Sequence, residues 1–221
     1  MLNNAESRGA IAPVVEPIAR ALLRARITPD MVTLTGTTLT VGTALWLIPQ
    51  GRFIPALILL VVFTLADVLD GTMARLSGTQ GPWGAWFDAT LDRVADGAVF
   101  GGLLIWAAWH SDTLTTMLAW VCLVGGTVIS YAKARAEAVG ATANGGIAER
   151  AERMIVVGVG AILYQFVDWG ITAAVAVLAV LTTITVLQRG LDVRRQLKPL
   201  SEAPGPAGDQ GDRGPGGAAG A

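Results

Sequence analysis

Four aspartates within one short stretch are the residues of this chain best placed to do chemistry. The stretch, residues 67–92, reads DVLDGTMARLSGTQGPWGAWFDATLD and contains Asp67, Asp70, Asp88 and Asp92. All four lie in or beside long apolar runs, where an ionised side chain costs a few kcal/mol unless a partner compensates its charge. The function must therefore lie in whatever compensates these acids.

Helical spacing groups the aspartates into two pairs. Asp67 and Asp70 are about 60° apart around a helix, and Asp88 and Asp92 are about 40° apart, so each pair shares a face. If the two helices are antiparallel neighbours joined by the loop at 77–83, the pairs meet. Four converging carboxylates repel one another unless a cation lies between them. Ligation by oxygen alone favours a hard cation such as magnesium or manganese, which these ligands do not tell apart.

Small residues accompany the acids. Gly71, Ala74 and Gly84 leave open backbone where a bulky ligand can approach. Arg75 lies one turn past Gly71 and can reach a phosphate. Metal ligands, bare backbone and a guanidinium together suit a pyrophosphate substrate.

The composition predicts an all-α integral membrane protein. Of the 221 residues, 52% are hydrophobic and 15% charged, with a mean hydropathy of +0.54, which is too apolar for an ordinary soluble domain. The single cysteine, Cys122, excludes an internal disulfide. We expect no cleavable signal peptide, because charges interrupt the first 25 residues.

Three regions are expected along the chain. Residues 1–28 form a juxtamembrane segment whose part 11–26 is an amphipathic helix lying in the membrane surface. Residues 29–197 form a domain of six apolar spans long enough to cross a bilayer. The Pro- and Gly-rich tail, 198–221, is expected to be disordered. The predicted spans are 31–49, 53–76, 84–109, 113–138, 150–168 and 171–195.

The charge distribution predicts the orientation in the cell membrane. Six spans put both termini on one side, and of the 16 Lys and Arg residues only Arg52 lies towards the other side. The positive-inside rule makes the charged side cytoplasmic. The four aspartates lie towards that face as well, so their substrates are expected to be cytoplasmic.

Two other uses of the aspartates remain open. They could form salt bridges with Arg75 and Arg93 that hold the helices together, although two arginines do not neutralise four acids. They could instead line an ion or proton pathway in a membrane protein without transferase activity. Against a pathway, the acids cluster at one boundary and no chain of polar residues continues to the other side.

The motif Asp67-x2-Asp70-Gly71-x2-Ala74-Arg75-x8-Gly84-x3-Asp88-x3-Asp92 resembles the signature of the CDP-alcohol phosphotransferase family at all eight positions. This resemblance implies a six-helix membrane bundle, usually dimeric, with a metal site in a cytoplasmic cavity. It also implies transfer of a phosphatidyl group from a CDP-linked lipid, with release of CMP.

The same resemblance implies a role for each position. Asp67, Asp70 and Asp88 become ligands of two divalent cations, with Asp92 as general base and possible further ligand. Gly84 would allow close helix approach. The CDP site would be lined by Asp30, Thr33, Asp67, Gly71, Ala74 and Arg75. The pattern around Asp30, TPDMVT, matches the family with Asp in place of Asn, which keeps an acceptor but changes the contact to the nucleotide.

Cations late in the chain indicate an anionic acceptor. Lys133, Arg153 and Arg189 each lie set back near a span end, whereas ordinary positive-inside anchoring accounts equally well for Arg150. The wider pattern, with SYAKARAEA and GG-x2-ER-x-ER, is similar to the actinobacterial phosphatidylinositol phosphate synthases of the family. That similarity implies inositol 1-phosphate as acceptor, its phosphate bound by Lys133, Arg153 and Arg189 with Arg135 nearby. A synthase using glycerol 3-phosphate stays the alternative, since it also needs such a pocket.

Overall fold

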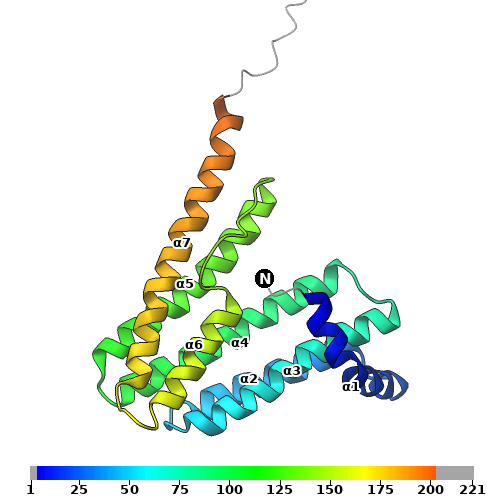
Figure 1. Ribbon diagram of the computed structural model, residues 1–221, viewed down its shortest axis with the longest axis horizontal. Helices are drawn as coiled ribbons and strands as arrows, with labels where there is room; N and C mark the ends of the chain where they lie inside the picture. Colours follow the sequence, from blue (N-terminus) through cyan, green and yellow to red (C-terminus); the bar gives the residue numbers. More distant parts are fainter. Residues whose placement is uncertain (1–3, 203–221) are drawn as a thin grey trace, which may run out of the picture.

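A computed structural model describes residues 4–202, with side chains for 13–64 and 67–198, and this part of the chain contains helices and loops but no strands. The helices are α1 (Asn4–Arg24), α2 (Pro29–Leu47), α3 (Phe53–Ser77), α4 (Pro82–Trp109), α5 (Thr113–Ala138), α6 (Arg150–Leu163) and α7 (Gly170–Glu202). Figure 1 shows α5 and α7 running in one direction and α2, α3 and α4 in another, the two groups meeting near one end.

Local chemistry sets the helix ends. The Thr28 hydroxyl accepts a hydrogen bond from the Met31 amide, and Pro29 occupies the first turn of α2. Gly78, with a φ of 68°, ends α3 in the left-handed region that glycine tolerates. Asp112 caps α5 by accepting from the Thr115 amide at 3.0 Å. The ends therefore follow from residues that the sequence already marks.

The observed helices agree with the predicted all-α membrane fold. Three of them, α3, α5 and α7, are long and apolar enough to cross a bilayer. α6 is shorter than the predicted span 150–168, because the chain turns after Leu163. α7 runs on to Glu202, so the first five residues of the predicted disordered tail are helical; the rest of that tail lies outside the described residues.

Packing between the helices corrects one expectation. α2 lies against both α3 and α4, α5 lies between α4 and α7, and α6 packs on α7 and α3. Among the described residues, α3 and α4 have no extensive contact with each other, although the sequence suggested direct neighbours. A short loop, residues 78–81, joins them, and α2 packs against both. A space therefore opens between the two aspartate pairs.

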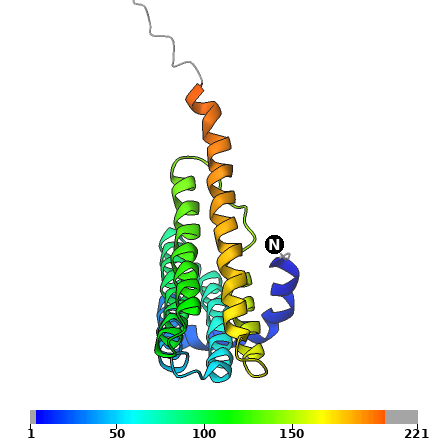
Figure 2. The same cartoon turned by 90° about the vertical axis from the view of Figure 1, so that its left-hand side faces the viewer.

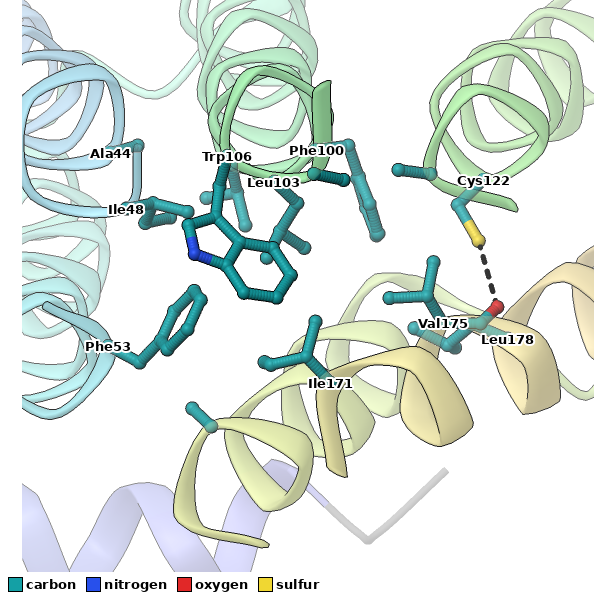
Figure 3. Packing of buried hydrophobic residues seen from close by; sticks show 14 of the residues in the cluster. Ala44, Ile48, Phe53, Phe100, Leu103, Trp106, Cys122, Ile171, Val175 and Leu178 are labelled. Atoms are coloured by element: carbon teal, nitrogen blue, oxygen red, sulfur yellow. Dashed lines mark hydrogen bonds between the residues drawn. The ribbon is translucent and has the colours of Figure 1, made fainter. Parts of the chain in front are cut away.

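The apolar core includes Phe53, Trp106 and Ile171 (Figure 3), and Phe53 and Trp106 lie at the opposite ends of α3 and α4 from Asp67 and Asp92. Phe53, Trp106 and Tyr164 meet edge to face with ring centroids 5.0 to 5.5 Å apart. A Cβ on Gly102 would lie 2.6 Å from the Ala44 carbonyl oxygen, so this glycine lets α4 approach α2 closely. This end holds the helices in register.

At the other end, α7 extends well past the bundle, as Figure 2 shows. The loop after α5 is fastened to it. Thr185 accepts from the Ile147 and Ala148 amides, and Gln196 exchanges hydrogen bonds with Thr142. The loop that leads into α6 thus has a fixed path.

Candidate active site

A cavity of about 410 Å³ separates the two aspartate pairs. Its walls come from α2, α3, α4 and α6, with Asp67 on one side and Asp92 on the other. Thr33, Thr37 and Thr40, about one turn apart, line the α2 wall. The rest of the wall is largely apolar, so the cavity combines acids with a surface suited to a lipid.

Arg150, at the start of α6, bridges the two sides. Its Nη1 lies 2.5 Å from Asp92 Oδ1 and 3.3 Å from Asp67 Oδ2. Its Nε donates to Asp96 Oδ1 at 3.2 Å. Positive-inside anchoring accounts for Arg150 in the sequence, yet its side chain reaches into the site.

Asp96 gathers three arginines although it lies outside the eight-position motif. It is buried, and it also accepts from Arg153 Nη2 at 2.6 Å and contacts Arg93 Nη1 at 3.3 Å. The salt-bridge alternative is thus realised in part: Arg93 pairs with Asp96 and approaches Asp92 at 3.7 Å. Arg75 instead donates to the Thr72 hydroxyl at 2.7 Å, and within the described residues it forms no salt bridge with these acids.

Two predicted nucleotide contacts have protein partners. The Thr33 hydroxyl, which also contacts the Pro29 carbonyl, donates to Asp70 Oδ2 at 2.5 Å. Asp30 accepts from the Trp83 indole Nε1 at 2.9 Å. Asp30 therefore faces the start of α4, where Trp83 fixes its carboxylate.

The remaining motif positions are open. Asp88 is exposed but close enough to interact electrostatically with Asp67, Asp70 and Asp92. A Cβ on Gly71 would meet no other atom within 4 Å, which fits open backbone beside the acids.

Gly84 corrects an expectation. A Cβ there would also meet no atom within 4 Å, so Gly84 makes no close helix contact in the described part of the chain.

The predicted acceptor cations divide into buried and exposed residues. Arg153 and Arg189 are almost fully buried. Arg189 donates to the carbonyl oxygens of Ile129 and Gly145, which fixes α7 against α5 and the loop. Lys133 and Arg135 are exposed on the last turns of α5, and Lys133 lies one turn after Ile129. The geometry thus brings Lys133 and Arg189 to one region, with Arg189 already engaged.

The donor chemistry fits a hard divalent cation, since the site offers carboxylate oxygens alone. The residues that would hold it are Asp67, Asp70, Asp88 and Asp92. Over the described residues, however, no three acids, histidines or cysteines converge closely enough to enclose an ion. Arg150 lies where Asp67 and Asp92 would otherwise face an ion together.

Sequence reasoning missed the contributions of Asp96 and Trp83. Asp96 lies one turn after Asp92, so helical spacing would have put it on the same face. Nothing in the sequence spacing of Trp83 links it to Asp30. Such a contact depends on how α2 packs beside α4.

Comparison with known proteins agrees with this geometry. The family model for CDP-alcohol phosphatidyltransferase matches residues 26–185. The phosphatidylinositol phosphate synthase of Mycobacterium marinum is 48% identical over 188 residues, covering 83% of this chain and 80% of that protein. That of Mycolicibacterium smegmatis is 45% identical, covering 90% and 93%.

Solved structures give the same relationship. The crystal structure of Mycobacterium tuberculosis phosphatidylinositol phosphate synthase with CDP-DAG bound aligns with a TM-score of 0.79 at 44% identity, covering 82% of this chain and 94% of that one. A structure of that enzyme with manganese and citrate aligns with a TM-score of 0.78 at 45% identity, covering 81% and 88%. By the family match and these relatives, the chain belongs to the CDP-alcohol phosphatidyltransferase family.

Proposed function

We propose that the chain is a phosphatidylinositol phosphate synthase, which transfers the phosphatidyl group of CDP-diacylglycerol to inositol 1-phosphate and releases CMP. The observation that carries the proposal is the cavity bounded by Asp67 and Asp92, with apolar walls beside the acids and Arg150 in its lining. Relatives at 45% to 48% identity bear that name.

In the proposed reaction, Asp92 accepts the proton of an inositol 1-phosphate hydroxyl. That oxygen forms a bond to the lipid-proximal phosphorus, and the bond from this phosphorus to the bridging oxygen breaks. CMP leaves with the electron pair. Two divalent cations, magnesium or manganese, supply charge neutralisation for the pyrophosphate and the departing CMP when bound by Asp67, Asp70, Asp88 and Asp92.

Other residues bind and orient the substrates. Asp30, Thr33, Gly71, Ala74 and Arg75 line the CDP site together with Asp67. Asp30 and Thr33 are held by Trp83 and Asp70, which limits their motion before substrate arrives.

The acceptor phosphate is bound by Lys133, with Arg153 and Arg189 behind it and Arg135 nearby. Lys133 is exposed near the end of α5, so its ammonium group can meet a phosphate. The two buried arginines add positive potential and shape the pocket.

The proposal includes the placement in the membrane. Six spans put the termini and the active site on the cytoplasmic side, with α1 lying in the membrane surface. Single cysteines introduced at each end of the chain, labelled in intact cells with a reagent that does not cross the membrane, test this orientation. The proposal also includes a homodimer, which light scattering of the detergent-solubilised chain would test.

The deciding experiment measures CMP release from CDP-diacylglycerol and Mg²⁺ by the purified protein. Parallel reactions contain inositol 1-phosphate, free inositol or glycerol 3-phosphate. We expect release with inositol 1-phosphate alone. Release with glycerol 3-phosphate but none with inositol 1-phosphate would assign the chain to the phosphatidylglycerophosphate synthases instead.

A further inference from the structure

A single guanidinium occupies the place where the acids of α3 and α4 come closest. Arg150 Nη1 contacts one oxygen of Asp92 at 2.5 Å and one of Asp67 at 3.3 Å. Its side chain is 31% exposed, and that of Asp92 is 19% exposed, so water screens this contact only in part. The carboxylate proposed as general base is therefore bound to an arginine.

The contact uses atoms that a divalent ion would need. Asp67 Oδ2 and Asp92 Oδ1 accept from Arg150, and oxygens of these two carboxylates are proposed metal ligands. A guanidinium hydrogen and a divalent cation compete for the lone pairs of the same oxygens, and the two positive charges repel each other at that distance, so binding of an ion favours departure of Nη1. Arg150 supplies positive charge that keeps Asp67 and Asp92 from repelling each other in the meantime.

Arg150 has a second attachment that metal binding leaves in place. Its Nε donates to Asp96 Oδ1 at 3.2 Å. Asp96 is itself held by Arg153 at 2.6 Å and by Arg93 at 3.3 Å. When Nη1 leaves the acids, the Nε bond keeps the guanidinium at the cavity wall, of which Arg150 is already part. The released charge then faces the space available to an anionic substrate.

We infer that Arg150 is a positioning residue that holds Asp67 and Asp92 together without metal, competes with divalent cations for them, and stays tethered by Asp96 once displaced. This inference rests on the proposed function for the identity of the metal ligands. The new element is that, without metal, the Arg150 guanidinium serves as a cation that a divalent ion can displace.

Manganese binding to the purified full chain, without any substrate, tests the competition. Free Mn²⁺ is measured by electron paramagnetic resonance in detergent micelles. We expect Arg150→Gln to bind Mn²⁺ about tenfold more tightly than the wild type, because no charge-assisted hydrogen bond has to be broken. Arg194→Gln removes the same charge from an exposed site on α7 and should bind as the wild type does.

Thermal unfolding gives a second readout. In EDTA, Arg150→Gln should unfold at a lower temperature than wild type, since Asp67 and Asp92 lose their counter-charge. Added Mn²⁺ should raise its unfolding temperature more than that of the wild type. If Arg150→Gln does not stay folded without metal, Arg150→Lys decides, because lysine keeps the charge but lacks the planar fork. It should also bind Mn²⁺ more tightly than the wild type.

Weaker or unchanged Mn²⁺ binding in Arg150→Gln, or in Arg150→Lys where that variant decides, would overturn the inference. Such a result would make Arg150 a support of the metal-bound site rather than a competitor. The assay contains no CDP-lipid and no acceptor, so a wrong acceptor assignment leaves it unaffected. Conversely, if Arg150→Gln binds Mn²⁺ more tightly as expected but the wild type releases no CMP with any acceptor, the result counts against the proposed function alone.

Discussion

The two ends of the bundle differ in packing: one is apolar and closely packed, and the other is charged and contains the cavity. At one end Phe53, Trp106 and Ile171 are almost fully buried, and Gly102 lets α4 touch the α2 backbone. At the other end Asp67 and Asp92 stay partly exposed across a cavity, joined by one long side chain. This difference indicates that contacts at the apolar end stabilise the bundle, so the charged end can stay open enough for substrates.

The largest effect should follow a change of one atom at the charged end. Asp92→Asn removes the proposed general base, and we expect kcat for CMP release to fall by about 10² to 10⁴. The fold should survive, because the core lies at the other end. Asp168→Asn, the same change at an exposed acid between α6 and α7, is the matched control and should keep full activity. Full activity in Asp92→Asn would remove its catalytic role.

The apolar end should respond in the reverse way. Trp106→Ala deletes a ring that is 4% exposed and packed between Phe53 and Tyr164. We expect a loss of about 3 kcal/mol in the free energy of unfolding, measured by chemical denaturation in detergent, with kcat of the folded fraction unchanged. Trp109→Ala, one turn away but 69% exposed, should cost much less. A large drop in kcat of Trp106→Ala with unchanged stability would contradict the conclusion that the apolar end supports stability and the charged end supports catalysis.

The sequence predicts the apolar end better than the charged end, for physical reasons. Apolar runs of sufficient length specify helices, so four of the six predicted spans agree within about two residues with α2, α3, α4 and α5, and a fifth begins one residue after the start of α7. The motif spacing also assigns the aspartates to the correct helices. What spacing does not contain is which helices are neighbours, because that depends on packing over the whole bundle.

That missing information explains the particular errors. The aspartate pairs were expected to meet if α3 and α4 were direct neighbours, and Gly84 to allow close helix approach. Among the described residues, α2 instead packs against both helices, and a Cβ on Gly84 would meet no atom within 4 Å. Arg150 is far from Asp67 along the chain, so its contact depends on the path of the loop before α6. The sequence periodicity around an arginine does not indicate which distant residue its long side chain contacts.

An intermediate effect is expected at the acceptor cations. Lys133→Ala should raise KM for inositol 1-phosphate about tenfold, because one ionic contact to the phosphate is lost. KM for CDP-diacylglycerol should change little, and steady-state kinetics with each substrate varied in turn measures both. Arg194→Ala is the control for loss of a positive charge. Equal rises in both KM values would mean that Lys133 supports the fold instead.

The smallest effect concerns a cap outside the spans. Hydrogen bonds from the Thr115 hydroxyl and amide hold the pKa of Asp112 below its usual value of 3.8. A lowered pKa stabilises the fold above pH 3.8, and that contribution is lost as pH falls through the folded-state pKa. Asp112→Ala should cost about 1 kcal/mol at neutral pH. Its difference from wild type in unfolding temperature should shrink on acidification; a constant difference would argue against the cap.

The length of α7 helps to fix the position of Arg150. With 33 residues, α7 is about 50 Å long, whereas the hydrocarbon layer is about 30 Å thick. The loop before α6 is fastened along the exposed length of α7 at Thr185, Arg189 and Gln196. Arg150 follows directly after that loop. The position of its guanidinium along the bundle is therefore set by hydrogen bonds to α7, a helix of which no described residue lines the cavity.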